Sequence, residues 1–372
     1  MKLIVTCSSG TEASVKRELY KLGIEDAKAV DGKIELDGDF ELLAKLCVWL
    51  RCADRVFIEL AKFKATTFDE LFDNVKNIPF TEYFKKYTRV MLNGNCYNSS
   101  LMAIKTCGSV IKKAVMSVMN DEYGTSSETG STMTLYFTIF NDICSIMIDA
   151  CGSGLHKRGY RELTYTAPLK ETLACSLIDL SVYSAKKTLV DPFCGSGTIP
   201  IEAAMIARNI APGLNRHFDF EKLKYFPKYI LENVKKDAKL QENDNIVNIY
   251  ASDINPEAIE MAKENARKAG VEQYIHFQVL DMKNFKSDEE YGIIISNPPY
   301  GDRLSTKDEV KKIYKNFAQM FKGLKDWSCY ILTDVKEFES IMGKKATKKR
   351  KLYNARIECT YFSFMGNKPK KV

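Results

Sequence analysis

A glycine-rich stretch at residues 189–198 constrains the fold more than any other part of the chain. A short apolar run leads into Asp191, and Gly195 and Gly197 follow just before a segment with helical character. Glycines allow the backbone to pass close to a ligand, and the free N–H groups at the start of a helix attract negatively charged groups. The stretch therefore predicts a strand, a nucleotide-binding turn and a helix, with an ordinary strand-to-helix turn as the alternative.

The residues around this turn narrow the choice of cofactor. A dinucleotide fingerprint needs a third glycine, but Ile199 and Pro200 stand there, and no Lys-Ser or Lys-Thr pair follows to hold a triphosphate. An NAD site and an ATP site are therefore both disfavoured. The remaining pattern, Asp-x-x-x-Gly-x-Gly, is that of S-adenosylmethionine (SAM) methyltransferases. Residues 297–300, Asn-Pro-Pro-Tyr, form the motif of those enzymes that methylate amino groups.

Three segments carry a resemblance to a known family: residues 191–203, residues 297–300 and the approach segment 158–174. Together they resemble the THUMP-containing RNA guanine-N2 methyltransferases, above all the N-terminal half of the bifunctional bacterial 23S rRNA methyltransferase. The resemblance covers nearly the full chain, although its specific motifs all lie after His156. It implies SAM as the cofactor and RNA as the partner, in the form of 23S rRNA or an assembly intermediate of the large ribosomal subunit.

The expected fold is α/β, with a Rossmann-like, seven-stranded SAM methyltransferase domain preceded by an α+β region. Alternating strand and helix patterns indicate a ferredoxin-like unit over residues 1–65, and the resemblance implies a THUMP-like RNA-binding domain over residues 66–154. Residues 155–185 are expected to form a linker and a lead-in helix, and residues 186–372 the methyltransferase domain. From the first 150 residues alone, a scaffold without a binding role is the alternative.

The composition agrees with a cytoplasmic protein that contacts nucleic acid. The chain of 372 residues has a formal net charge of +7, which suits a polyanionic partner without requiring one. No run approaches the roughly 18 apolar residues of a membrane span, and no signal peptide is indicated. The 11 cysteines include no C-x-x-C pair and the three histidines are far apart, so neither a metal site nor a disulfide framework is expected. The oligomeric state stays open.

Two basic clusters flank the methyltransferase motifs. Residues 344–351 carry six lysines and arginines on a segment expected to be a loop near the substrate face. Residues 156–161 combine His156 and three cationic side chains with the aromatic ring of Tyr160, a mixture that holds phosphates and stacks bases. A solvated surface is the alternative for each cluster. Their position beside the motifs favours nucleic acid.

The cofactor-binding residues are expected at the ends of three strands. Asp253 follows the second strand, where an acid accepts hydrogen bonds from ribose hydroxyls, with N-capping of the next helix as the alternative. Asp281 follows the third strand, at the position where the acid of the resembling family contacts the adenine amino group. The expected cofactor-binding residues are Asp191, Pro192, Phe193, Gly195, Ser196, Gly197, Thr198, Asp253, Ile254, Asp281 and Met282.

The motif at residues 297–300 supplies the expected catalytic residues, Asn297, Pro298, Pro299 and Tyr300. An exocyclic base amine is a poor nucleophile because its lone pair is conjugated into the ring. The side-chain oxygen of Asn297 and the carbonyl oxygen of Pro298 are expected to accept hydrogen bonds from this amine, and Tyr300 to stack on an extruded base. Cys194, inside the glycine turn, is expected to be a small buried packing residue and not a nucleophile.

These features together predict SAM-dependent methylation of the N2 amine of a guanine in RNA, most of all in 23S rRNA. Three alternatives stay open. A tRNA guanine-N2 methyltransferase would share both modules. An adenine-N6 methyltransferase of nucleic acid, or a glutamine-N5 methyltransferase of protein, also uses Asn-Pro-Pro-Tyr but would not need an RNA-capture unit. A non-catalytic RNA-binding protein would not bind SAM.

Overall fold

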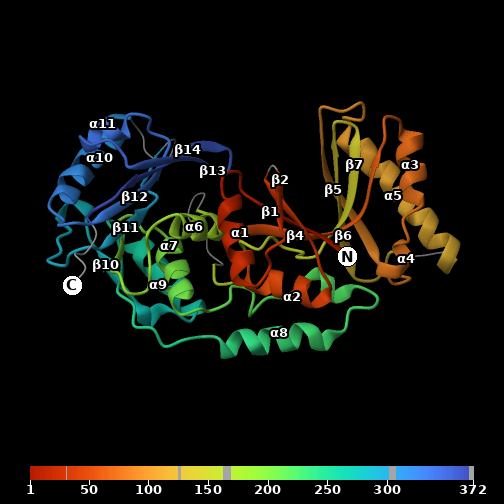
Figure 1. Cartoon of the computed structure of the whole chain (residues 1–372), viewed down its shortest axis with the longest axis horizontal. Helices are drawn as coiled ribbons and strands as arrows, with labels where there is room; N and C mark the ends of the chain where they lie inside the picture. Colours follow the sequence, from red (N-terminus) through yellow and green to blue (C-terminus); the bar gives the residue numbers. More distant parts are fainter. Residues whose placement is uncertain (31, 125–126, 162–168, 301–306, 368–372) are drawn as a thin grey trace.

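The computed structural model describes residues 1–30, 32–124, 127–161, 169–300 and 307–367. Within these residues the strands form two sheets of seven strands each. The two sheets belong to two halves of the molecule, which lie side by side along its long axis (Figure 1). The alternating and mixed element order confirms the α/β fold expected from the sequence.

The N-terminal sheet has the strand order β2-β3-β1-β4-β7-β6-β5 and is antiparallel except for the pair β5 and β6. Its strands are β1 (Lys2–Cys7), β2 (Lys28–Val30), β3 (Lys33–Asp37), β4 (Ala53–Lys64), β5 (Arg89–Tyr97), β6 (Thr132–Phe140) and β7 (Ile143–Asp149). The long strand β4 pairs with β1 on one side and with β7 on the other. The two units expected over residues 1–65 and 66–154 therefore share one sheet.

Local sequence signals explain several elements of this half. Its helices are α1 (Glu12–Lys21), α2 (Phe40–Trp49), α3 (Phe68–Lys76), α4 (Phe80–Tyr83) and α5 (Ile104–Tyr123). A capping box formed by Thr67 and Glu70 starts α3. The β6–β7 turn places Asn141 and Asp142 at φ values of 50° and 62°, the positive values that a tight hairpin turn needs. Strand β2 was not predicted, because its three residues are all exposed and show no apolar alternation.

The second sheet has the order β10-β9-β8-β11-β12-β14-β13, in which β14 runs antiparallel to both of its neighbours and the other pairs are parallel. Its strands are β8 (Leu189–Asp191), β9 (Ile249–Asp253), β10 (Ile275–Val279), β11 (Ile293–Ser296), β12 (Ser328–Thr333), β13 (Lys348–Asn354) and β14 (Ile357–Phe364). This arrangement confirms the expected seven-stranded methyltransferase sheet, and its last two strands form an antiparallel hairpin. All four residues of β11 are buried, as expected for a parallel strand covered on both faces.

The helices of this half are α6 (Glu171–Asp179), α7 (Thr198–Ala207), α8 (Lys228–Leu240), α9 (Pro256–Lys268), α10 (Lys307–Lys322) and α11 (Phe338–Met342), with short 3₁₀ turns η1 (Asp219–Lys222), η2 (Glu272–Tyr274) and η3 (Met282–Asn284). The loop predicted for residues 344–351 is wrong in part, because Lys348 to Lys351 lie in β13. This strand is at the edge of the sheet, where lysines discourage pairing with another strand.

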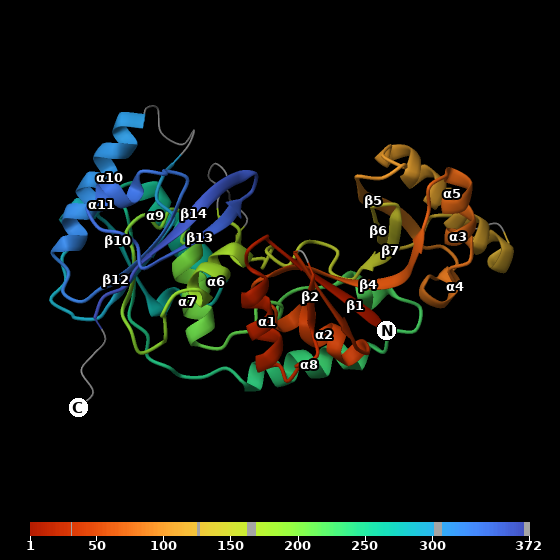
Figure 2. The same ribbon diagram turned by 45° about the horizontal axis from the view of Figure 1, so that its top comes forward.

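The segment between α7 and β9 is an insertion, longer than a plain crossover needs, and it packs against the core of the N-terminal half. Its helix α8 runs beneath α1 and α2 in both views (Figures 1 and 2). Phe226 packs edge-on against Phe40 of α2 and against Phe220, with ring centroids 5.4 and 4.8 Å apart. The aromatic rings of this insertion therefore pack between the two halves of the molecule.

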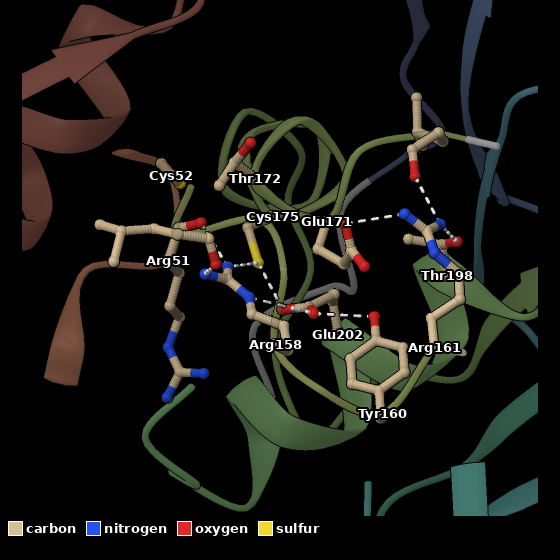
Figure 3. A network of polar contacts seen from close by, with 12 residues as sticks. Arg51, Cys52, Arg158, Tyr160, Arg161, Glu171, Thr172, Cys175, Thr198 and Glu202 are labelled. Carbon is tan, nitrogen blue, oxygen red and sulfur yellow. Dashed lines mark hydrogen bonds and ion pairs between the residues drawn. The ribbon is translucent and has the colours of Figure 1, made fainter. Parts of the chain in front are cut away.

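A buried polar network also joins the halves (Figure 3). The Arg158 guanidinium donates to the carbonyl oxygens of Leu155 and Arg51, each at 2.6 Å, and its Nε lies 3.5 Å from Glu202 Oε1. Glu202 also accepts hydrogen bonds from the Tyr160 hydroxyl at 2.9 Å and the Cys175 thiol at 2.8 Å. Because Arg51 precedes β4 and Glu202 lies in α7, the network fixes one half against the other.

Burial in this network corrects the predicted role of residues 156–161. The side chains of Arg158 and Glu202 are 2% and 0% exposed, and Tyr160 is 4% exposed, so Arg158 and Tyr160 are unavailable to RNA. Burial by itself lowers the pKa of Arg158, but the neighbouring groups, with Glu202 the foremost, together outweigh it and hold the pKa above its ordinary value. Of this cluster, Lys157 is exposed and is compatible with an RNA contact.

Replacing Arg158 with alanine is expected to lower the free energy of unfolding by about 3–5 kcal/mol, because Glu202 would keep a buried charge without its partner. Urea denaturation followed by fluorescence measures this loss. The matched control is Arg17→Ala. Arg17 of α1 pairs with Asp179 of α6, and the Arg17 side chain is 45% exposed. That control should cost at most about 1 kcal/mol. Equal losses of unfolding free energy in the two variants would contradict the conclusion that the Arg158–Glu202 pair is buried and joins the two halves.

Candidate active site

The glycine turn lies between β8 and α7, as the sequence predicted. Gly195 and Gly197 have φ values of 50° and 83°, a region that favours glycine. A Cβ at Gly197 would lie 3.0 Å from the Cβ of Ala262, so this glycine also permits close packing against α9. The Gly195 N–H donates to Asp253 Oδ2 at 3.0 Å and thereby ties the turn to the end of β9.

A cavity of about 480 Å³ opens next to this turn, at the carboxyl ends of β10, β9, β8 and β11. The structure brings most of the expected site residues together there. The expected residues that line the cavity are Asp191, Pro192, Phe193, Gly195, Ser196, Thr198, Asp253, Ile254, Asp281, Met282, Asn297 and Pro299. The other expected residues, Gly197, Pro298 and Tyr300, are outside this lining.

Further residues of the cavity wall were not assigned from the sequence. They are Leu169, Cys194, Ile199, Asn255, Ala258, Met261, Ile313 and Asn316. The helical spacing of Ala258 and Met261 after Asp253 could have identified α9 as a wall, but no sequence signal connects the distant α10 to the turn. Cys194 is 7% exposed and burial raises the pKa of its thiol well above the usual value, which supports the predicted packing role.

Asp191 is the most deeply buried acid of the cavity, at 2% exposed. Burial raises its pKa to about 7, even though the Ser296 hydroxyl donates to Asp191 Oδ1 at 2.5 Å and acts in the opposite direction. The carboxyl group is therefore partly protonated near neutral pH. A cation bound in the cavity would favour its ionised form.

The two other acids of the cavity are held by backbone N–H groups. Asp253 Oδ1 accepts from the N–H of Asn255 at 3.0 Å. The capping alternative for Asp253 is wrong, because the Asn255 side chain caps α9 by accepting from the Glu257 N–H. Asp281 accepts from the Lys283 N–H at 3.1 Å and pairs with the Lys283 ammonium at 2.8 Å, and this pair lowers the pKa of Asp281.

Asn297 presents an acceptor at the cavity wall. Its Oδ1 is buried and has no hydrogen-bond partner in the described part of the chain. Buried polar atoms are nearly always satisfied, and an unsatisfied one costs about 1–3 kcal/mol. The next lining residue, Pro299, is held in place because its carbonyl oxygen accepts from the Tyr314 hydroxyl at 3.3 Å. The site therefore holds an oxygen that a ligand N–H or O–H can satisfy.

Tyr300 lies away from the cavity, in the core of the methyltransferase half. Its side chain is 1% exposed, and its hydroxyl accepts a hydrogen bond from Asn354 Nδ2 at 2.8 Å. The expected stacking of this ring on a base does not fit this conformation, because neither face of a fully buried ring is available. In the structure Tyr300 anchors the end of the motif to β13.

Comparison with known proteins supports the assignment of this half as a methyltransferase domain. A family model described as the RMKL-like methyltransferase domain matches residues 158–363, more than half of the chain, and the RlmL ferredoxin-like domain matches residues 2–57. The chain belongs to the RMKL-like methyltransferase family. A Bacillus subtilis protein of this kind, YpsC, which is named as an RNA methyltransferase on a provisional basis, is 40% identical over 97% of this chain and 95% of its own.

Two further relatives bear on activity and cofactor. The Psychromonas ingrahamii large-subunit rRNA methyltransferase K/L is 32% identical over 96% of this chain, which spans about half (49%) of that protein. The crystal structure of SMU.472, described as a methyltransferase on a provisional basis and solved with S-adenosylhomocysteine (SAH), is 35% identical, with a TM-score of 0.93 and 99% coverage of both chains.

The cofactor is therefore SAM, from which SAH forms when the methyl group is transferred. The residues present fit this group, because the turn lacks the side chains that would fill the cradle and three acids line the cavity beside it. Among the described residues, no group of three or more His, Cys, Asp or Glu side chains is arranged to hold a metal ion. Nor is any helix of that part of the chain long and apolar enough to span a membrane.

SAM binding is expected to release protons at about pH 6–7. Folding raises the pKa of Asp191 to about 7, so the stability that its protonated form contributes falls as the pH rises from about 4 toward 7. The positive charges of SAM favour the ionised carboxylate and expel its proton. Titration calorimetry in buffers with different ionisation enthalpies measures the release. Asp191→Asn should abolish it and the exposed Asp37→Asn should not, whereas equal heats in all buffers would contradict the assignment.

Proposed function

We propose that the protein transfers the methyl group of SAM to the exocyclic N2 amine of a guanine in RNA, and that this RNA is 23S rRNA or an assembly intermediate of the large subunit. The observation that carries the proposal is the buried, unsatisfied Oδ1 of Asn297 at the wall of the SAM cavity. An amine with two N–H groups is the complement of such an acceptor.

The chemistry requires that the amine be made nucleophilic. Hydrogen bonds from its two hydrogens to Asn297 Oδ1 and to the Pro298 carbonyl oxygen would localise the lone pair on nitrogen and stabilise the positive charge that develops there. Proline suits the second position because it has no N–H group to compete for these acceptors. SAM supplies an activated methyl group, so orientation of the amine toward it provides much of the remaining rate enhancement.

The cofactor residues take complementary parts in this proposal. Asp253 would accept hydrogen bonds from the ribose hydroxyls, and Asp281 from the adenine amino group. Asp191 would face the positively charged amino-acid part of SAM. The sheet order β10-β9-β8-β11 places Asp281 and Asn297 at opposite ends of the row, so adenosine and the target amine would occupy different ends of the cavity.

The RNA substrate is supported by the relatives and by the N-terminal half. YpsC and the K/L enzymes are named for RNA and large-subunit rRNA, respectively. The chain carries the ferredoxin-like domain that matches RlmL and a net charge of +7, both compatible with RNA capture. Because the chain spans about half of the K/L enzymes, their target nucleotides carry over only as part of this proposal.

Incubation with labelled SAM and separate pools of tRNA, rRNA and DNA is expected to yield N2-methylguanosine in 23S rRNA, identified by mass spectrometry of the digested nucleosides. Asn297→Ala should reduce the rate about 100- to 1000-fold, because one acceptor of the developing charge is lost, while SAM still binds. The matched control is Asn245→Ala, an exposed asparagine before β9. Label in tRNA would contradict 23S rRNA as the substrate, and label on adenine would contradict guanine as the target base. Label in no nucleic acid would contradict the assignment of an RNA substrate.

A further inference from the structure

Arg161 does not line the SAM cavity but hydrogen-bonds to residues of its wall; Figure 3 shows it beside Thr198 and Glu171. Its Nη1 donates to the Leu169 carbonyl oxygen at 3.0 Å and to Thr198 Oγ1 at 3.2 Å, and its Nη2 pairs with Glu171 Oε2 at 2.9 Å. Leu169 and Thr198 both line the cavity. The guanidinium, whose side chain is 10% exposed, thus holds two points of the wall at once.

The contact with Thr198 leaves the hydroxyl hydrogen of that residue available. A threonine hydroxyl has one donor hydrogen and two acceptor lone pairs. Within the described residues Arg161 is its one hydrogen-bond partner, and an arginine can only donate, so it occupies a lone pair of Oγ1. A hydroxyl that accepts from a cation becomes a stronger donor, because hydrogen bonds in a chain polarise one another.

The position of Thr198 indicates which part of SAM it meets. Thr198 is the first residue of α7, directly after the turn that follows β8. Asp253 and Asp281, the proposed adenosine contacts, end β9 and follow β10, so the sheet order leaves the β8 side of the cavity for the amino-acid part. The carboxylate of that part is the one anionic group of SAM at neutral pH.

The surroundings of Thr198 favour an anion. The unsatisfied N–H groups at the start of a helix carry partial positive charge, and α7 is ten residues long. The charge of Arg161 adds to this field and is balanced by Glu171, whose own carboxyl group is buried and does not line the cavity. An anion docked at Thr198 would therefore find a polarised O–H donor and a favourable potential.

We propose that Arg161 is a positioning residue of the cofactor site, which fixes and polarises the Thr198 hydroxyl so that this hydroxyl donates to the carboxylate of SAM. Arg161 acts through Thr198 and does not itself touch the cofactor. The inference rests on the proposed placement of adenosine at Asp253 and Asp281, but it is independent of the RNA substrate and of the base that is methylated.

Calorimetric binding of two ligands to the purified chain of 372 residues tests the proposal. The first ligand is SAM, and the second is decarboxylated SAM, which keeps the adenosine, the sulfonium and the amine. Thr198→Val removes the hydroxyl and nearly preserves the volume, whereas Thr198→Ser keeps the hydroxyl. Arg161→Met removes the donor behind it, and Arg17→Met is the matched control, since Arg17 also pairs with a carboxylate of α6 but is remote from Thr198.

Thr198→Val and Arg161→Met are each expected to weaken SAM binding about 10- to 100-fold, the range of one hydrogen bond to a charged group. They should leave the affinity for decarboxylated SAM unchanged. Thr198→Ser and Arg17→Met should bind both ligands like the unaltered protein, and the double variant Thr198→Val with Arg161→Met should be no weaker than Thr198→Val alone.

Three results would overturn the inference. One is an equal loss of affinity for both ligands, which would indicate a merely structural role. Another is unchanged SAM affinity in Thr198→Val. Arg161→Met leaves the buried Glu171 carboxylate without its partner and could fail to fold, whereas Thr198→Val should fold in either case. The third is additive losses in the double variant, which would show that the two residues act separately. None of these results depends on methyl transfer to RNA, so failure of the proposed function is recognised independently.

Discussion

The ion pair between Arg158 and Glu202 is the interaction on which the relation between the two halves depends. Removing both charges from water is costly, and their attraction offsets that cost only where the remaining donors and acceptors are also satisfied. The structure meets this condition, since two carbonyl oxygens accept from Arg158 and the Tyr160 hydroxyl and Cys175 thiol donate to Glu202. A pair so fully satisfied tolerates little change of geometry, because any displacement leaves a buried charge without a partner.

The consequence reaches the active site through α7. Glu202 lies in the first turns of this helix, and the helix begins at the residue that follows the glycine turn. The cofactor cradle is thus tied to the backbone of Arg51, in the N-terminal half, by two contacts: Glu202 pairs with Arg158, and Arg158 donates to the Arg51 carbonyl oxygen. Packing of the insertion aromatics against α2 acts in the same direction. If the N-terminal half captures RNA, these contacts between the two halves determine the position of the RNA relative to the methyl donor.

Sequence analysis succeeded where the signal is local. The glycine turn, the acids at strand ends and the apolar parallel strands follow from neighbouring residues, and the structure brings Asp191, Asp253 and Asn297 to one cavity. It failed where burial depends on distant partners. Arg158 resembles an RNA contact until Glu202, 44 residues later, is placed beside it, and Tyr300 resembles an exposed stacking ring until β13 covers it. A single sequence shows charge and aromaticity, but not which side chain covers another.

In the proposed function, the unsatisfied oxygen of Asn297 favours an exocyclic amine over a ring nitrogen. A ring nitrogen with a free lone pair is the better nucleophile in water, but it has no hydrogen to offer, and binding it would bury the Asn297 acceptor without a partner. That mismatch costs about 1–3 kcal/mol for one group, and sites built to bind an N–H discriminate strongly against analogues that lack it. The unsatisfied acceptor thus supports the proposed exocyclic amine, even though that amine is the weaker nucleophile.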